Sequence, residues 1–146
     1  MTAILDTNPA PTVPGWVRIV ALIGAVWYAF GLLQFWLAFT MDPSAELANG
    51  AMTQAHAAAV ADTPGGIWAA FALASFAGLV GSVLLFRRSG LATLVFGVSL
   101  ACALIYYGWI YGISATGWNR PMEEMVIGIV VVLVTFGFFN LSLRQR

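Results

Sequence analysis

Few side chains in the long apolar stretches of this sequence could do chemistry, and the most unusual of them is Gln34. An amide in hydrocarbon needs a hydrogen-bond partner. Two interpretations follow: a hydrogen bond to another helix, which we favour because such bonds are a common packing device, or a contact in a small polar cavity. Four tyrosines would line that cavity with Gln34, namely Tyr28, Tyr106, Tyr107 and Tyr111.

The other reactive side chains form no recognisable catalytic or metal-binding set. His56, the only histidine, lies among alanines and is expected at the surface, and the single cysteine, Cys102, is expected to be a small packing residue. The absence of lysine excludes a Schiff base. Glu123 and Glu124 suit the first turn of a helix, and no acid lies at membrane depth to couple ion transport. We therefore predict no catalytic residue, no cofactor, no metal and no enzyme.

The composition indicates an all-α integral membrane protein. Of 146 residues, 61% are hydrophobic and only 8% are charged, and the mean hydropathy is +0.90. A soluble domain is about a quarter charged, so this balance needs a surface that faces lipid. Because a spanning helix needs about 20 apolar residues, we predict spans near 16–39, 66–86, 91–113 and 125–143. They form one membrane domain, 1–146, that begins with a flexible N-terminal segment, 1–14.

The arginines predict how the spans are oriented. Five fall on one side of the predicted spans, namely Arg18, Arg87, Arg88, Arg144 and Arg146, and only Arg120 falls on the other. Basic residues near helix ends are retained in the cytoplasm. We therefore expect both termini in the cytoplasm, with loops 41–65 and 114–124 on the outer face of a bacterial inner membrane. The net formal charge is zero, so nothing suggests nucleic acid as a partner.

The loops predict how the helices are connected. The turn Arg87-Arg88-Ser89-Gly90 is so short that the second and third spans must form a hairpin, which indicates an antiparallel four-helix bundle. Asp42-Pro43 is typical of a helix start, so the first outer loop is expected to hold a short interfacial helix. An interruption at Asn49-Gly50 would divide it into two. Pro121 is expected to lie early in the fourth helix.

Small residues in the second span predict close helix packing. Ala70, Ala74, Gly78 and Ser82 recur every four residues, and Gly81 lies beside them on nearly the same face. Membrane helices pack where small residues let their backbones approach. We expect this ridge to pack inside the bundle, with an oligomer interface as the alternative.

A stretch over about residues 50–100 resembles a known group of proteins. The matching residues are Met52-Thr53-Gln54, Thr63-Pro64, Ile67-Trp68, Phe71-Ala72, Phe76-Ala77-Gly78, Leu79, Gly81, Leu84-Leu85, Arg87-Arg88, Ala92 and Ser99-Leu100. They resemble small bacterial four-transmembrane-helix proteins of uncharacterised function, which are sometimes labelled sugar-transporter-like. This chain departs from their pattern in its two glycines after Pro64 and in Gly90, where tryptophan is frequent. The resemblance implies a bacterial inner-membrane location and adds no catalytic residue.

Two functions fit these observations. The missing chemistry and the small-residue ridge favour a non-enzymatic accessory or interaction protein, whose partners would be the lipid bilayer and either a larger membrane protein or further copies of this chain. The alternative is a small carrier or channel for a neutral or lipid-like solute, with the path lined by Gln34 and the tyrosines. The two functions differ in whether Gln34 faces another helix or a hydrated cavity.

Overall fold

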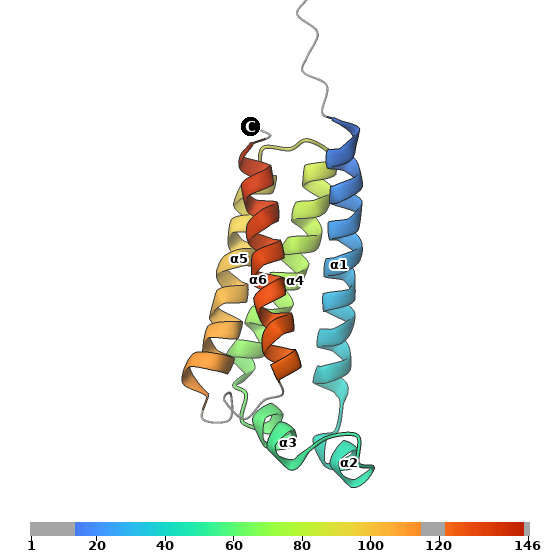
Figure 1. Ribbon diagram of the computed structural model, residues 1–146, viewed down its shortest axis with the longest axis vertical. Helices are drawn as coiled ribbons and strands as arrows, with labels where there is room; N and C mark the ends of the chain where they lie inside the picture. The colour runs from blue at the N-terminus through green and yellow to red at the C-terminus, as the bar shows by residue number, and fades with distance from the viewer. Residues whose placement is uncertain (1–13, 115–121, 145–146) are drawn as a thin grey trace, which may run out of the picture.

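The computed structural model describes residues 14–114 and 122–144, and every regular element in those ranges is helical (Figure 1). The long helices are α1 (Gly15–Thr40), α4 (Gly65–Phe86), α5 (Ala92–Gly108) and α6 (Met122–Leu143). Two short helices, α2 (Pro43–Ala48) and α3 (Gln54–Ala61), lie at one end of the bundle. A π-helical turn, η1 (Trp109–Ile113), continues α5.

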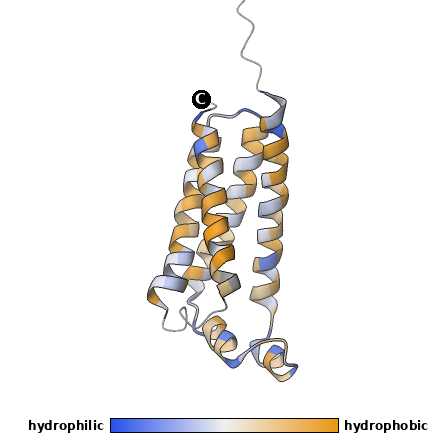
Figure 2. Ribbon diagram, in the orientation of Figure 1, coloured by the Kyte–Doolittle hydropathy of each residue, from blue (hydrophilic) through white to orange (hydrophobic). Residues whose placement is uncertain are grey.

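The helical fold with four apolar spans is confirmed. Each long helix, with η1 counted as part of α5, is long and apolar enough to cross a membrane. Hydrophobic residues predominate along all four (Figure 2). The predicted bounds differ from the observed helix ends by three residues at most, at the start of α6. Hydropathy locates these helices well because each lies between residues that stop a helix, such as Pro14, Asp42-Pro43 and Pro64.

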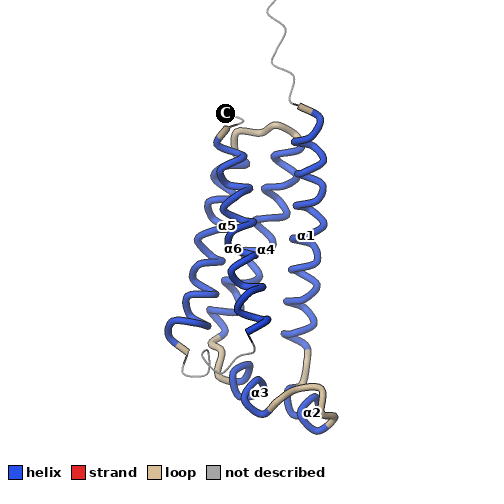
Figure 3. Tube along the Cα trace, in the orientation of Figure 1, coloured by secondary structure: helices blue, strands red, loops and turns tan. Residues whose placement is uncertain are grey.

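The four long helices form a bundle in which each helix packs on the next long helix along the chain. α1 packs on α4, α4 on α5 and α5 on α6, whereas the backbones of α1 and α6 scarcely approach each other. The start of α1, the α4–α5 turn and the end of α6 lie together at one end, opposite α2 and α3 (Figure 3). We call the first the arginine end, because Arg18, Arg87, Arg88 and Arg144 belong to it, and the second the loop end.

The turn between α4 and α5 is tight because the end of α4 satisfies its own carbonyl groups. The Ser89 backbone N–H donates to the Leu84 carbonyl at 2.9 Å, and the Arg88 N–H donates to the Leu85 carbonyl at 3.1 Å. This pair of bonds is the Schellman motif, which places its turning residue in the left-handed region. That residue is usually glycine but here is Arg88, with φ of 62°.

The segment between α1 and α4 holds two short helices rather than one. The Asp42 carboxylate accepts hydrogen bonds from the Ser44 hydroxyl at 2.6 Å and the Ser44 backbone N–H at 2.9 Å, and Pro43 occupies the first helical position of α2. These bonds lower the pKa of the Asp42 carboxyl below its usual value, and the bond from the Ser44 hydroxyl has the larger effect. Gly50, with φ of +72°, then separates α2 from α3. The residues predicted to cap and to interrupt the loop therefore do so.

Two predictions concern residues outside the described ranges. The flexible N-terminal segment 1–14 lies almost entirely outside them, and so do Arg120 and Pro121. The backbone of Glu123 and Glu124 belongs to the first turn of α6, where carboxylates were expected.

The arginine end of the bundle is tightly packed. Its core consists of Val17, Ala21, Tyr28, Leu85, Ala92, Phe96 and Phe138, and we call this region the packed half. Aromatic rings lie directly on glycines of neighbouring helices: a Cβ atom added to Gly78 would overlap the Tyr28 ring, and one added to Gly81 would come within 3.0 Å of Phe96. Rings and glycines therefore bring these helices together in the absence of a hydrophobic force between them.

Candidate functional site

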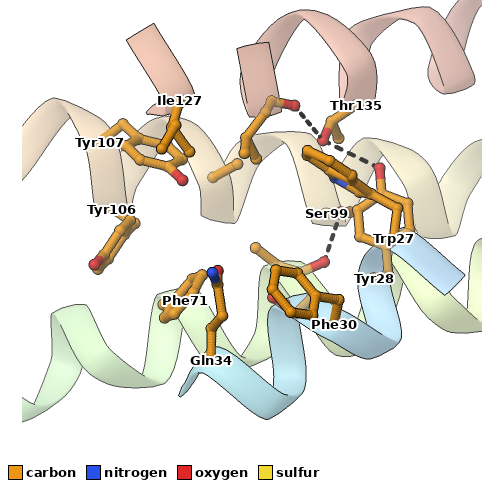
Figure 4. Close-up of a pocket in the computed structure, with 15 residues that line it drawn as sticks. Trp27, Tyr28, Phe30, Gln34, Phe71, Ser99, Tyr106, Tyr107, Ile127 and Thr135 are labelled. Atoms are coloured by element: carbon orange, nitrogen blue, oxygen red, sulfur yellow. Dashed lines mark hydrogen bonds between the residues drawn. The ribbon is translucent and has the colours of Figure 1, made fainter. Parts of the chain in front are cut away.

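The other half of the bundle, towards the loop end, contains a cavity of about 230 Å³ that we call the deep cavity (Figure 4). Its walls come from all four long helices: Trp27, Tyr28, Phe30, Gly31 and Gln34 of α1, Phe71, Ala74 and Ser75 of α4, Ser99, Ala103, Tyr106 and Tyr107 of α5, and Ile127, Val131 and Thr135 of α6. Phe30 and Ile127 are each more than half exposed. Because they flank the space where α1 and α6 fail to meet, the cavity opens sideways between these two helices.

A second cavity of about 260 Å³, the mouth cavity, lies nearer the loop end. Met41, His56, Val60 and Thr63 border it on the side of α3. It shares five lining residues with the deep cavity, namely Gln34, Phe71, Tyr106, Tyr107 and Ile127. The two cavities therefore adjoin at these five residues, which form what we call the junction. We call the half of the bundle that holds both cavities the hollow half.

A hydrogen-bonded floor closes the deep cavity towards the packed half. The Tyr28 hydroxyl donates to the Thr135 hydroxyl oxygen at 3.1 Å, and the Thr135 hydroxyl donates in turn to the Val131 carbonyl at 2.8 Å. The Ser99 hydroxyl donates to the Ala74 carbonyl at 2.7 Å and so joins α5 to α4. The donors of the floor are thus bound to the protein itself, and the cavity ends where the packed half begins.

Aromatic rings in contact with one another make up the wall of the hollow half formed by α4 and α5. Phe71 stacks on Tyr106 with ring centroids 4.7 Å apart, Tyr106 meets Tyr107 edge to face at 5.0 Å, and Tyr107 stacks on Tyr111 at 6.1 Å. Such contacts favour fixed ring orientations. Gly128 lets α6 approach this wall, because a Cβ there would lie 2.9 Å from Tyr107.

The π-helical turn η1 lies directly beyond this aromatic wall. Its defining bond runs from the Ser114 N–H to the Trp109 carbonyl, five residues back, at 2.9 Å. A π-helical turn is wider than an α-helical turn and therefore changes the angle between side chains one turn apart. Tyr107, before the turn, and Tyr111, within it, have nearly parallel rings with an interplanar angle of 6°. The sequence analysis missed this turn.

The five residues predicted to line a cavity all do so. Tyr28 lines the deep cavity, Tyr111 lines the mouth cavity, and Gln34, Tyr106 and Tyr107 line both. The favoured interhelical bond of Gln34 is not found: among the residues that the structure describes, its amide has no hydrogen-bond partner. The bond that links α1 to another helix at this depth comes from Tyr28.

The small-residue ridge of α4 lies inside the bundle. Ala70, Ala74, Gly78, Gly81 and Ser82 are all buried, and Ser82 is 0% exposed. Gly78 receives Tyr28 of α1 and Gly81 receives Phe96 of α5, so the ridge contacts the helices on both sides of α4. The surface that motivated an oligomer interface is therefore occupied by the chain itself.

Sequence reasoning missed several residues of the site. Ser99 and Phe71 were named only among the residues of the resemblance, and Thr135 was not assigned to the cavity. Thr135 lies 107 positions from its partner Tyr28, so no local pattern connects them. Ser99 carried the one available signal, because a hydroxyl seven residues before Tyr106 is set back about two helical turns on nearly the same face.

The cavities are neutral and mildly polar. Among their described lining residues the polar groups are an amide, hydroxyls, the indole N–H groups of Trp27 and Trp68, and His56 at the mouth, and none is a carboxylate or a guanidinium. Within the described part of the chain no cluster of histidine, cysteine, aspartate and glutamate could hold a metal ion. Cys102 is half-buried on α5 and lines neither cavity. The arrangement can bind a neutral molecule.

Comparison of the chain with protein-family models, with curated proteins and with solved structures finds no match. The resemblance to small bacterial four-helix proteins therefore stays a prediction.

Proposed function

We propose that this chain is a multi-pass membrane protein that binds a neutral, lipid-like molecule in the cavities of its hollow half. The observation that carries the proposal is the convergence of Gln34 and the four tyrosines on two adjoining cavities whose described lining holds no carboxylate or guanidinium. Ligand sites in proteins are mostly apolar and contain a few well-placed polar groups. The sideways opening between α1 and α6 suits a ligand that arrives from the bilayer.

The proposal includes a location and an orientation. The four helices would form an antiparallel transmembrane bundle in a bacterial inner membrane, with both termini and the arginine end in the cytoplasm. The exposed Arg87, Arg88 and Arg144 support this, because basic residues near helix ends favour the cytoplasmic side. The hollow half would then face the outer leaflet. A reporter active only in the cytoplasm, fused after Leu143, should be active, and an inactive one would reverse the orientation.

The geometry supports binding or carrying more than conduction. A channel needs a continuous path, and here the packed half closes the deep cavity with the Tyr28–Thr135 bond and the core behind it. A carrier would have to open this floor. Binding or carrying a ligand requires no chemical reaction, so the protein would be non-enzymatic and would need no cofactor.

An accessory role in a larger assembly is the second candidate, and one observation favours it. The gap between α1 and α6 leaves a space at the side of the bundle into which a partner's transmembrane helix could pack. Packing of that kind would use the exposed side chains of Trp27, Phe30 and Ile127, which otherwise contact lipid.

A cavity-filling substitution distinguishes these functions. Val131→Phe places a ring in the deep cavity, whereas Val130→Phe places the same ring on an exposed part of α6. We expect native mass spectrometry of the wild-type protein from mild detergent to show a bound neutral lipid, which Val130→Phe retains and Val131→Phe loses. Identical lipid in all three samples would contradict binding in the cavity. A protein partner that only Val131→Phe releases would favour the accessory role.

A further inference from the structure

Two polar groups at the junction of the cavities have no hydrogen-bond partner within the described part of the chain. The Gln34 amide and the Tyr107 hydroxyl line both cavities, and neither has a hydrogen-bond partner among the residues that the structure describes. They enter from opposite walls, Gln34 from α1 and Tyr107 from α5, and their polar ends point into the space between (Figure 4). Gln34 is exposed and Tyr107 is half-buried, so both groups are accessible to a water or a ligand that could satisfy them.

Three other hydroxyls of the deep cavity, those of its floor, are already bound. Tyr28 donates to Thr135, Thr135 donates to Val131, and Ser99 donates to Ala74. Their protons are therefore not available to a ligand. The junction thus differs from the floor: the floor holds helices together, whereas the junction presents hydrogen-bond donors and acceptors to whatever occupies the cavity.

The chemistry of these two groups defines the ligand's polar end. An amide offers an N–H donor and a carbonyl acceptor, and a phenol offers one donor and an acceptor oxygen. A hydroxyl is the smallest head that can use both, by donating to the Gln34 carbonyl oxygen while it accepts from the Tyr107 hydroxyl. A phosphate or carboxylate would lie in an apolar site where the described lining supplies no countercharge, which is unfavourable.

The size and the opening of the cavities define the rest of the ligand. The volumes of about 230 Å³ and 260 Å³ suit a head group and the start of a chain but not a whole lipid. The remaining chain can leave between α1 and α6, past the exposed Phe30, and lie among lipid tails. Volumes of this size leave room for one chain rather than two.

We infer that Gln34 and Tyr107 together bind the hydroxyl head of a neutral single-chain lipid whose tail occupies the deep cavity. This inference rests on the proposed function. It assigns recognition of the head to the junction and contact with the tail to the rest of the deep cavity.

Three probes with the same tail test the inference: hexadecanol, hexadecyl methyl ether, which cannot donate a hydrogen bond, and hexadecane, which has no head. Their affinities for the purified protein in detergent are measured by native mass spectrometry. We expect the alcohol to bind about tenfold more tightly than the ether. Gln34→Leu and Tyr107→Phe should each weaken hexadecanol binding about fivefold and leave hexadecane binding unchanged.

Matched controls separate the outcomes. Asn140→Leu also removes an intramembrane amide, but Asn140 lies towards the arginine end and lines neither cavity, so hexadecanol should bind it as it binds the wild-type protein. Equal binding of all three probes by wild type, Gln34→Leu and Tyr107→Phe, with loss in Val131→Phe, would overturn the head-group site and leave the proposed function standing. Failure of the wild-type protein to bind any probe would overturn both. The comparison of the three probes on the wild-type protein needs no variant to fold.

Discussion

In the packed half α1 and α6 are in contact through a ring that lies on a glycine, whereas in the hollow half the two helices separate and leave two cavities. The difference comes from α1 and α6. In the packed half Gly24 of α1 receives Phe138 of α6, and Tyr28 bonds to Thr135. One helical turn beyond Tyr28, towards the loop end, Gly31 receives only Ser75 of α4. The position of a cleft in this bundle is therefore set by where glycines stop facing large side chains of α6.

The largest expected effect comes from deleting one ring in each half. Phe96 is 0% exposed in the packed core, so Phe96→Ala should lower the free energy of unfolding by about 3 kcal/mol. Phe71 is half-buried and borders existing cavities, so Phe71→Ala should cost only about 1 kcal/mol. Denaturant unfolding in mild detergent measures both. Equal losses would show that the two halves are packed alike.

The next effect tests the contact between α1 and α6. A Cβ at Gly24 would overlap the Phe138 ring and lie 2.8 Å from the Ser82 hydroxyl oxygen, so Gly24→Ala should cost about 2 kcal/mol. Gly137→Ala is the control, because nothing lies within 4 Å of a Cβ there. That change should be neutral or stabilise α6 by up to about 1 kcal/mol. A neutral Gly24→Ala would mean that this glycine does not determine where the packed half ends.

The turns at the two ends should respond in opposite directions. Gly50, at the loop end, and Arg88, at the arginine end, both have left-handed backbones, which cost a residue with a side chain about 1 kcal/mol. Gly50→Ala should therefore lower the thermal stability of the protein, and Arg88→Gly should raise it. If Arg88→Gly lowers stability, the arginine side chain contributes more there than its backbone strain costs.

The smallest effect separates the two kinds of tyrosine. Tyr28→Phe removes the bond to Thr135 and should cost about 0.6 kcal/mol, the average for such bonds within membranes. Tyr107→Phe should leave the unfolding free energy unchanged, because no described residue bonds to its hydroxyl. A loss in Tyr107→Phe as large as that in Tyr28→Phe would mean that the junction is structural.

The sequence predicted the helices and the composition of the site but not its shape. Hydropathy and proline positions are local, so the spans and the start of α2 at Asp42-Pro43 could be located to within a few residues. Gln34 stood out because an amide is rare in hydrocarbon. Its surroundings could not be predicted, because they depend on contacts such as Tyr28–Thr135, between residues 107 positions apart. Nothing in the order of residues shows that Gly24 faces Phe138 while Gly31 faces Ser75.

The Tyr28–Thr135 bond also determines which part of α1 can move relative to α6. Beyond Tyr28, α1 continues to Thr40. This segment of α1 packs on α4 on one side and has no close neighbour on the other. At 1.5 Å per residue, this segment extends about 18 Å past the hydrogen bond to α6, and a tilt of about 10° would move its end by about 3 Å. A tilt of this segment relative to α6, with α4 following it, would thus widen or close the gap between α1 and α6.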